Sequence, residues 1–312
     1  MDPAIRENTG LKPDGSIVEW GGQTTPPPGG PNTGFVAVAA GMSHSLGLKA
    51  DGSIVAWGGN GDGQANVPAP NADFIGIAAG EYHSLGLKAD GSIVAWGAGG
   101  PGQSGSTLTR FGQSIVPSPN SGFVAVAGGG YHSLGLKADG SIVAWGGPRP
   151  GQSIIPHFGQ SVVPSPNSGF VGVAAGVFHS LGLKADGSIV AWGAGGPGQS
   201  GIAHCGQSVV PSPNSDFVAV AAFAGHSLGL KADGSIVAWG DNGVGQNNVP
   251  VPNSGFVAVA AGAWHSLGLK ADGSILAWGC SENHHGQCDV PAPNADFIGI
   301  AAGQTHSLAI RR

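Results

Sequence analysis

The sequence carries little charge. Lys, Arg, Asp and Glu make up 10% of its 312 residues, and the formal net charge is -6 at pH 7. A nucleic-acid-binding surface needs clustered Lys and Arg, and no such cluster is present. No apolar run approaches the length of a membrane span. We therefore expect no nucleic-acid partner and no membrane partner.

Cysteine is also scarce, and the N-terminal segment lacks the apolar core of a signal peptide. Three cysteines cannot all pair within one chain, so their number does not fix the redox compartment. The first ten residues read MDPAIRENTG, which is not a leader pattern. The localisation stays undetermined: secreted if a leader was removed, otherwise cytoplasmic.

No stretch shows the apolar period of an amphipathic helix, but an eleven-residue motif recurs. LKADGSIVAWG occurs five times, and near copies at Leu11–Gly21 and Leu269–Gly279 bring the number to seven. The histidines upstream of six copies, with His306 near the C-terminus, are 39 to 49 residues apart. Repeats of this length are typical of solenoids, propellers and arrays.

Each repeat contains strand-like segments. Residues 35–39 (FVAVA), 44–48 (HSLGL) and 53–57 (SIVAW) are rich in β-formers and bounded by Gly, Asp or Pro. Asp51-Gly52 suits a tight hairpin because glycine tolerates positive φ. The Val67-Pro68 segment could add a short fourth edge strand. Three or four antiparallel strands per unit predict a propeller blade.

The two chain ends are complementary. The last repeat runs from Phe297 to Ile310 without an SIVAWG segment, whereas the chain begins with LKPDGSIVEWG, which no FVAVA segment precedes. Pairing the ends would complete a blade and remove exposed sheet edges. We predict an all-β fold, a seven-bladed β-propeller formed by one domain over residues 1–312. Its last blade is expected from about residues 1–21 plus 297–312.

Comparison of the repeats with one another shows where they differ. The residue before each repeat histidine varies and is aromatic in four repeats, and the loops after WG are eight to ten residues longer in three consecutive repeats. Strand direction places both segments on one rim. The candidate partner-binding residues on this rim are Tyr82, Tyr131, Phe178, Trp264, Phe223, Arg110, Phe111, His157 and Phe158. Clustered exposed aromatics favour a protein interface, while the alternative is that they fold down and cap the blades.

Residues suited to catalysis or metal binding are few. We interpret the seven repeat histidines as structural, each bonded to neighbouring backbone. The segment Cys280–Cys288, with His284 and His285, is interpreted as a solvated loop, with a disulfide or a metal site as alternatives. Most acids lie singly in ADG turns, and no catalytic triad or zinc-protease motif is present. We expect no enzyme activity, no cofactor and no metal.

The unit order AAG-xx-HSLGL-K-DGS-IVAWG-xx-xGQ-xxVP, present along the whole chain, resembles the regulator of chromosome condensation repeat family. The resemblance implies a seven-bladed propeller. One branch of the family contains exchange factors for the small GTPase Ran. A second branch contains secreted bacterial β-lactamase inhibitory proteins, whose aromatic rim covers an enzyme's active-site entrance. By position, Tyr82, Tyr131, Phe178 and Trp264 match that rim, whereas the three long loops have no counterpart there.

The expected function is non-catalytic binding of an unidentified protein through one aromatic-rich rim. Enzyme inhibition of the β-lactamase-inhibitor type is the narrower form of this expectation. Two alternatives stay open: a structural or self-assembling propeller, and a guanine nucleotide exchange factor for a small GTPase.

Overall fold

A computed structural model describes residues 15–22, 27–28, 30–100, 111–147, 158–199, 203–281 and 284–312. These residues form seven three-stranded antiparallel sheets and no helix. Accordingly, no helix in these ranges is long and apolar enough to cross a membrane. The all-β prediction is confirmed.

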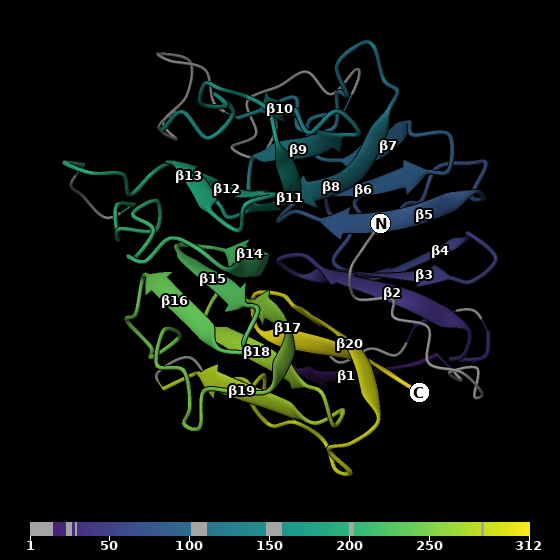
Figure 1. Cartoon of the computed structure of the whole chain (residues 1–312). Helices are drawn as coiled ribbons and strands as arrows, with labels where there is room; N and C mark the ends of the chain where they lie inside the picture. The colour runs from purple at the N-terminus through teal and green to yellow at the C-terminus, as the bar shows by residue number, and fades with distance from the viewer. Residues whose placement is uncertain are drawn as a thin grey trace.

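Each sheet is one blade, and its three strands come from the three apolar segments of the repeat (Figure 1). The first strands are β2 (Phe35–Ala40), β5 (Phe74–Ala79), β8 (Phe123–Gly128), β11 (Phe170–Ala175), β14 (Phe217–Phe223), β17 (Phe256–Ala261) and β20 (Phe297–Ala302). The middle strands are β3 (His44–Lys49), β6 (His83–Lys88), β9 (His132–Lys137), β12 (His179–Lys184), β15 (His226–Lys231), β18 (His265–Lys270) and β21 (His306–Arg311). The third strands are β4 (Ile54–Gly58), β7 (Ile93–Gly97), β10 (Ile142–Gly146), β13 (Ile189–Gly193), β16 (Ile236–Gly240), β19 (Ile275–Gly279) and β1 (Ser16–Gly21).

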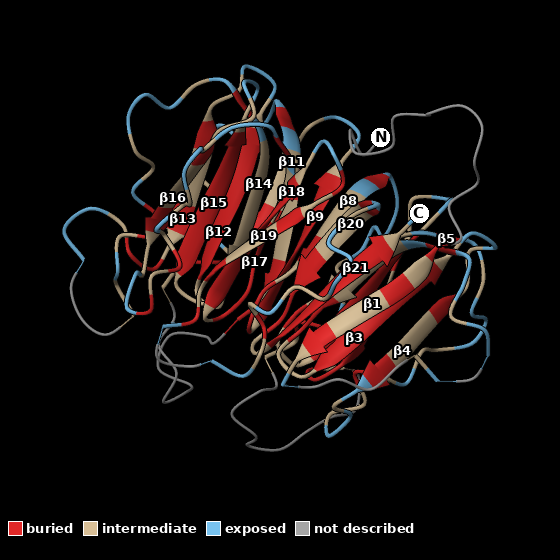
Figure 2. Cartoon of the chain, turned by 90° about the horizontal axis from the view of Figure 1, so that it is seen from below, coloured by how far each residue is buried: buried red, intermediate tan, exposed pale blue. Residues whose placement is uncertain are grey.

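The blades stand around a central axis in chain order, with the first strand of each blade innermost (Figures 1 and 2). Each of these inner strands contacts the inner strands of both neighbouring blades, and the contact between β2 and β20 completes the circle. We number the blades from 1, containing β2, to 7, containing β20. The expected seven-bladed propeller is confirmed.

Blade 7 joins the two ends of the chain. The N-terminal strand β1 pairs antiparallel with the C-terminal strand β21 from Ser16 opposite Arg311 to Gly21 opposite His306. In Figure 1 this is the sheet that contains purple β1 and yellow β20, with β21 between them in the strand order. The chain ends therefore complete one blade, as predicted. Of the expected N-terminal segment 1–21, the structure describes residues 15–21.

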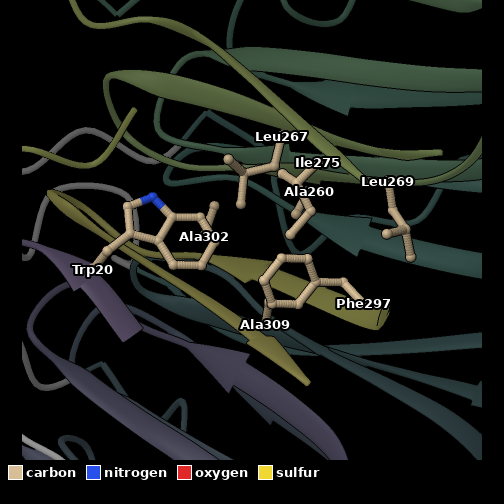
Figure 3. Packing of buried hydrophobic residues seen from close by; sticks show 8 residues of the cluster. All are labelled: Trp20, Ala260, Leu267, Leu269, Ile275, Phe297, Ala302 and Ala309. Carbon is tan, nitrogen blue, oxygen red and sulfur yellow. The ribbon is translucent and has the colours of Figure 1, made fainter. Parts of the chain in front are cut away.

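The core lies between blades, because both faces of every middle strand are buried (Figure 2). Figure 3 shows one such layer, in which Trp20 and Phe297 of blade 7 pack against Leu267 and Ile275 of blade 6. Burying a large apolar side chain contributes about 1.5–3 kcal/mol. These contacts recur at each blade boundary, which explains why the strands lack a polar face.

The Val-Pro segment does not form the fourth strand that was considered. Instead, an asparagine just beyond it pairs with the outer strand: Ile54 N donates to Asn71 Oδ1 and Asn71 Nδ2 donates to Ile54 O, both at 2.8 Å. All seven blades have this pair of bonds. Proline has no N–H that could donate to a neighbouring strand. The asparagine side-chain amide bonds the N–H and C=O of one outer-strand residue instead.

Candidate functional site

A ring of buried side chains lies directly beneath the variable rim. The histidine that starts each middle strand bonds through Nε2 to the serine Oγ of the next blade, at 2.7–3.0 Å. The pairs are His44–Ser84, His83–Ser133, His132–Ser180, His179–Ser227, His226–Ser266, His265–Ser307 and His306–Ser45. The histidines are structural as predicted, but their Nε2 partner is a serine hydroxyl rather than backbone. A hydrogen bond to backbone of the same blade would not link two blades, whereas the bond to serine links each blade to the next.

Each serine hydroxyl fixes the tautomer of its histidine. Ser84 Oγ donates its hydrogen to Gln64 O at 2.8 Å, so it can only accept from His44, whose proton must be on Nε2. The seven Nδ1 atoms have no hydrogen-bond partner among the described residues. Burial lowers the pKa of the repeat histidines to about 3, or about 4 for His226 and His306. The imidazoles are therefore neutral at pH 7.

The Gly-Gln pair after each WG loop fixes the variable residue in front of it. Gln113 O accepts bonds from Ser133 Oγ and Trp145 Nε1 at 2.9 and 2.8 Å. Its side-chain Oε1 accepts from Phe111 N at 2.7 Å. The same backward bond holds the residue before Gly-Gln in five other WG loops, namely Asp62, Phe158, Cys205, Val244 and His285. Each of these loops thus holds one variable residue at a fixed backbone position; Val244 at this position is buried, whereas Phe111 and Phe158 are partly exposed.

Blade 1 uses a different acceptor. The chain has Glu19 where the other outer strands have Ala, and its carboxylate accepts from Trp57 Nε1 at 3.0 Å and from Ser45 Oγ at 3.4 Å. In the other blades a glutamine backbone carbonyl accepts both bonds, as Gln64 O does from Trp96 Nε1 and Ser84 Oγ. The glutamate at this position of the first repeat motif therefore keeps the buried Trp57 and Ser45 hydrogen-bonded where the ring closes.

The residue before each repeat histidine contributes backbone to the scaffold. Its carbonyl accepts from the amide that follows WG, as between Ala98 N and Tyr82 O at 2.8 Å or Gly147 N and Tyr131 O at 2.6 Å. This bond is present in all seven blades. Since it involves no side chain, the position can vary without disturbing the strands.

In blades 2, 3 and 4 the two kinds of variable position form a continuous aromatic array. Tyr131 lies between Tyr82 and Phe178, with ring centroids 5.9 and 5.5 Å apart. Phe111 meets the edge of Tyr131 at 5.5 Å, and Phe158 meets Phe178 at 5.2 Å. Phe158 also meets His204 at 4.9 Å. We call these six residues the aromatic array; all are partly buried and partly open to solvent.

The tyrosine end of the array is polar. The Tyr131 and Tyr82 rings are in contact, with centroids 5.9 Å apart, so that two hydroxyl-bearing rings meet at this end. Burial, together with the charge of Glu81, raises the pKa of both phenols, so neither ionises near neutral pH. Burial also raises the pKa of Glu81 to about 7. The array therefore runs from this acidic, hydroxyl-bearing end to a phenylalanine-rich end.

Five of the predicted site residues lie in the array: Tyr82, Phe111, Tyr131, Phe158 and Phe178. Two others do not. Phe223 is buried, with 7% of its surface exposed, and the half-buried Trp264 packs against the same apolar cluster in blades 5 and 6. Phe223 and Trp264 therefore fit the interpretation that these aromatics fold down and cap the blades, not the interpretation that they form an exposed interface. Arg110 and His157 lie outside the described residues.

Two features of the rim differ from the sequence interpretation or were missed by it. Cys280 and Cys288 form a disulfide, so the preferred solvated-loop interpretation is wrong. The loop folds back so that Gln287 O accepts a hydrogen bond from Trp20 Nε1 at 2.9 Å. This folding brings Cys280 and Cys288 close enough to pair. His204 was missed as an array member; its place two residues before Gly-Gln was the available signal. Among the described residues, no group of three or more His, Cys, Asp or Glu could hold a metal.

Comparison with known proteins identifies the repeats. Residues 35–64, 74–103, 123–152, 170–199, 217–246 and 256–287 match the Regulator of chromosome condensation (RCC1) repeat. No curated protein matches the sequence. Prp20p from Saccharomyces cerevisiae is 19% identical, with a TM-score of 0.71 over 96% of this chain and 92% of that one. Human WBSCR16 is 17% identical, with a TM-score of 0.67 over 96% and 99%.

The ACR4 receptor kinase ectodomain from Arabidopsis thaliana is also similar in fold, with 21% identity and a TM-score of 0.61 over 86% of this chain and 90% of that one. At these identities the structures establish the fold alone. The narrower resemblance to β-lactamase inhibitory proteins is not shown by these comparisons. The six matched repeats cover more than half of the sequence, and the chain belongs to the regulator of chromosome condensation (RCC1) repeat family.

Proposed function

We propose that this propeller is a non-catalytic protein-binding module that contacts its partner through the aromatic array. The observation that carries the proposal is the continuity of the array. Six rings from three loops and three strand starts touch one another, and each retains exposed surface. Scattered apolar residues are ordinary on a protein surface, whereas contiguous aromatic groups are typical of interface hot spots.

Propellers of similar fold are described with protein partners. The Prp20p structure is reported with binding properties to Gsp1p and histones, and Kap60 has been crystallised bound to the same yeast protein. These partners belong to those proteins. They support the coarser proposal that a propeller of this shape serves as a platform for another protein.

The proposal is tested by affinity capture from the source organism and its neighbours, followed by mass spectrometry and a binding titration. Bait proteins are the wild type, Tyr131→Ala and Phe178→Ala, with Val251→Ala as the control because Val251 is 91% exposed and not part of the array. A hot-spot ring contributes at least about 2 kcal/mol, so each array variant should weaken binding about 30-fold. A partner that binds all four baits equally would contradict the proposal.

Enzyme inhibition is the narrower form of the proposal, in which the array covers an active-site entrance. Hydrolysis of a chromogenic β-lactam by a panel of β-lactamases, with wild type or Phe178→Ala added, tests it directly. Guanine nucleotide exchange is the competing function, suggested by the fold similarity to Prp20p. Release of a fluorescent guanine nucleotide from a small GTPase distinguishes the two.

A second surface favours self-association as the alternative function. The second residue of six inner strands is an exposed Val or Ile near the ADG turns, at the end of the propeller opposite the array. These residues are Val36, Ile75, Val124, Val171, Val218 and Val257, each 44–60% exposed. A rotationally repeated apolar surface suits a second copy of the chain. Sedimentation velocity of the wild type and Ile75→Ser, Val171→Ser would show dimers that the variant loses.

A further inference from the structure

The disulfide of this protein lies where the ring of blades closes. Cys280 and Cys288 stand at the two ends of the loop that follows β19 in blade 6. The residue before Cys288 is Gln287, which is fully buried. Its backbone carbonyl accepts from Trp20 Nε1 at 2.9 Å and from Ser307 Oγ at 3.0 Å. One carbonyl beside the disulfide thus holds a strand from each end of the chain, β1 and β21.

The same loop packs against the end of β1. A Cβ built on Gly21 would lie 3.1 Å from Gln287 Cα, and one built on Gly22 would lie 3.2 Å from His285 Cβ. Strand β1 is attached to β21 by hydrogen bonds rather than by a chain connection, because the chain after β1 continues into blade 1. The loop of blade 6 therefore contributes to keeping β1 in blade 7.

The two shorter WG loops, in blades 1 and 5, are closed by asparagines instead. In blade 5, Asn242 Nδ2 donates to Asn248 Oδ1 at 3.1 Å, and Asn242 Oδ1 accepts from Asn247 N at 2.8 Å. In blade 1, Asn60 makes the corresponding bonds, with Asn66 as its side-chain partner. We call this arrangement the asparagine clasp. It joins the start of the loop to the residues that follow the glutamine.

Blade 6 replaces the asparagine clasp with a covalent bond across the same span. Ser281 and Asp289 stand at the positions of the two clasp asparagines. Cys280 follows WG directly, Cys288 follows Gln287 directly, and the disulfide joins them. Amide hydrogen bonds do not respond to thiols, whereas a disulfide opens by thiol–disulfide exchange. The loop that holds the ring closure is thus closed by a redox-sensitive bond.

We propose that the Cys280–Cys288 disulfide is a redox-controlled latch on the ring closure, opened by a dithiol reductant. A reductant thiolate attacks Cys288 Sγ, the Sγ–Sγ bond breaks, and Cys280 leaves as a thiolate that takes up a proton. The second reductant thiol then attacks the mixed disulfide, which releases Cys288 as a thiol and leaves the reductant oxidised to its own disulfide. Attack begins at Cys288 because this residue is partly exposed, whereas Cys280 is 4% exposed.

Reduction frees the loop from its covalent restraint. Loss of a disulfide across a sequence separation of 8 favours opening of the loop by roughly 10- to 100-fold. When the loop opens, Gln287 no longer holds Trp20, and β1 can leave β21. The ring then opens at blade 7 in reducing surroundings and stays closed in oxidising ones. The latch does not depend on the aromatic array, which lies in blades 2, 3 and 4.

Hydrogen–deuterium exchange followed by mass spectrometry tests the latch. The protein carries Cys205→Ser, because Cys205 is the free and exposed cysteine, so that dithiothreitol acts only on the disulfide. On reduction, peptides covering β1 and β21 should exchange at least about tenfold faster. Peptides covering β10 and β13, in blades 3 and 4, should keep their rates because their local opening does not involve the loop. Equal acceleration in every blade, or unchanged exchange in β1, would refute the latch.

Two variants in the same Cys205→Ser background provide matched controls. In the first, residues 280–289 are replaced by the blade 5 loop, residues 241–248, which lies between the same Trp-Gly and Val-Pro pairs. This graft restores an asparagine clasp and should protect β1 with or without dithiothreitol. In the second, Cys280→Ser and Cys288→Ser should exchange like the reduced protein under both conditions. A graft that responds to dithiothreitol, or a double-serine variant that protects β1 as fully as the oxidised protein, would also overturn the inference.

Discussion

Lowering the pH from 7.5 to 5 should unfold this propeller, because its seven interblade histidines are held neutral. Their pKa in the folded protein is about 3 to 4, below the ordinary 6.5. A group with a lowered pKa in the folded state stabilises the fold fully above its unfolded pKa. That contribution is lost as the pH falls from about 6.5 towards the folded value.

The size of the effect follows from the number of histidines. Each pH unit below 6.5 costs about 1.4 kcal/mol per buried imidazole. Seven acting together cost about 10 kcal/mol per unit, comparable to the whole stability of an ordinary domain, about 5–15 kcal/mol. The turn aspartates, whose pKa is lowered by bonds from the following serine, titrate only below 3.8. The transition should therefore lie near pH 5 to 6, above the range in which the turn aspartates titrate.

Proton uptake on unfolding measures the same quantity directly. At pH 6.5, above the acid transition, the seven histidines should together take up about three to four protons on unfolding. Glu81 acts in the opposite direction, because its pKa is raised to about 7 in the folded state and it releases about one proton. The net uptake in guanidinium chloride, followed with a pH indicator dye, should be about three protons at pH 6.5 and near zero at pH 7.5.

Two results would refute this reasoning. One is a propeller that keeps its near-ultraviolet circular dichroism and a cooperative thermal transition at pH 4.5. The other is an uptake of fewer than about one proton at pH 6.5. Either would mean that the imidazoles are accessible or already charged, and that the His–Ser ring does not join the blades as neutral groups.

Three further changes address the scaffold. Glu19→Ala removes the acceptor of the buried Trp57 N–H and should cost about 1–3 kcal/mol in urea unfolding, with Glu19→Gln losing less because it keeps an acceptor. Replacing Cys280 and Cys288 by Ser opens an eight-residue separation and should cost about 2–3 kcal/mol, while the wild type under reductant shows the same loss. Gly80→Ala should prevent folding, as judged by circular dichroism and soluble yield, since its Cβ would lie 2.4 Å from a backbone oxygen of the next blade.

The architecture was predictable because the repeats are nearly identical and the two ends complement each other. The spacing of the histidines and the missing SIVAWG segment at the C-terminus predicted both the ring and its closure. The interblade partner of His44 was not predictable, because Ser84 is 40 residues away and belongs to the next repeat. Similarly, Asn71 gave no sign that it would replace a fourth strand.

The site was predictable in part, for a physical reason. Alignment of the repeats shows which positions vary, but not whether a side chain at such a position points outward. Phe223 stands where glycine is usual and turns into the apolar layer between blades 5 and 6, drawing Trp264 against it. In blades 3 and 4 glycine is kept, and the rings of Tyr131 and Phe178 stack across the blade boundary. The repeat alignment therefore identified the variable positions but not which of their side chains pack between blades.

The division between constant and variable positions follows from which atoms the scaffold uses. The His–Ser ring, the Gln carbonyls and the Trp N–H groups are buried and hydrogen-bonded to one another, so losing one of them without a substitute such as Glu19 leaves a buried group unpaired. At the rim above them, the scaffold needs only a carbonyl before His and an amide before Gly-Gln. Every residue supplies the carbonyl, and every residue except proline supplies the amide. Partner specificity can therefore change through the variable rim side chains while the blades beneath stay the same, and the aromatic array is one such choice among neighbouring blades.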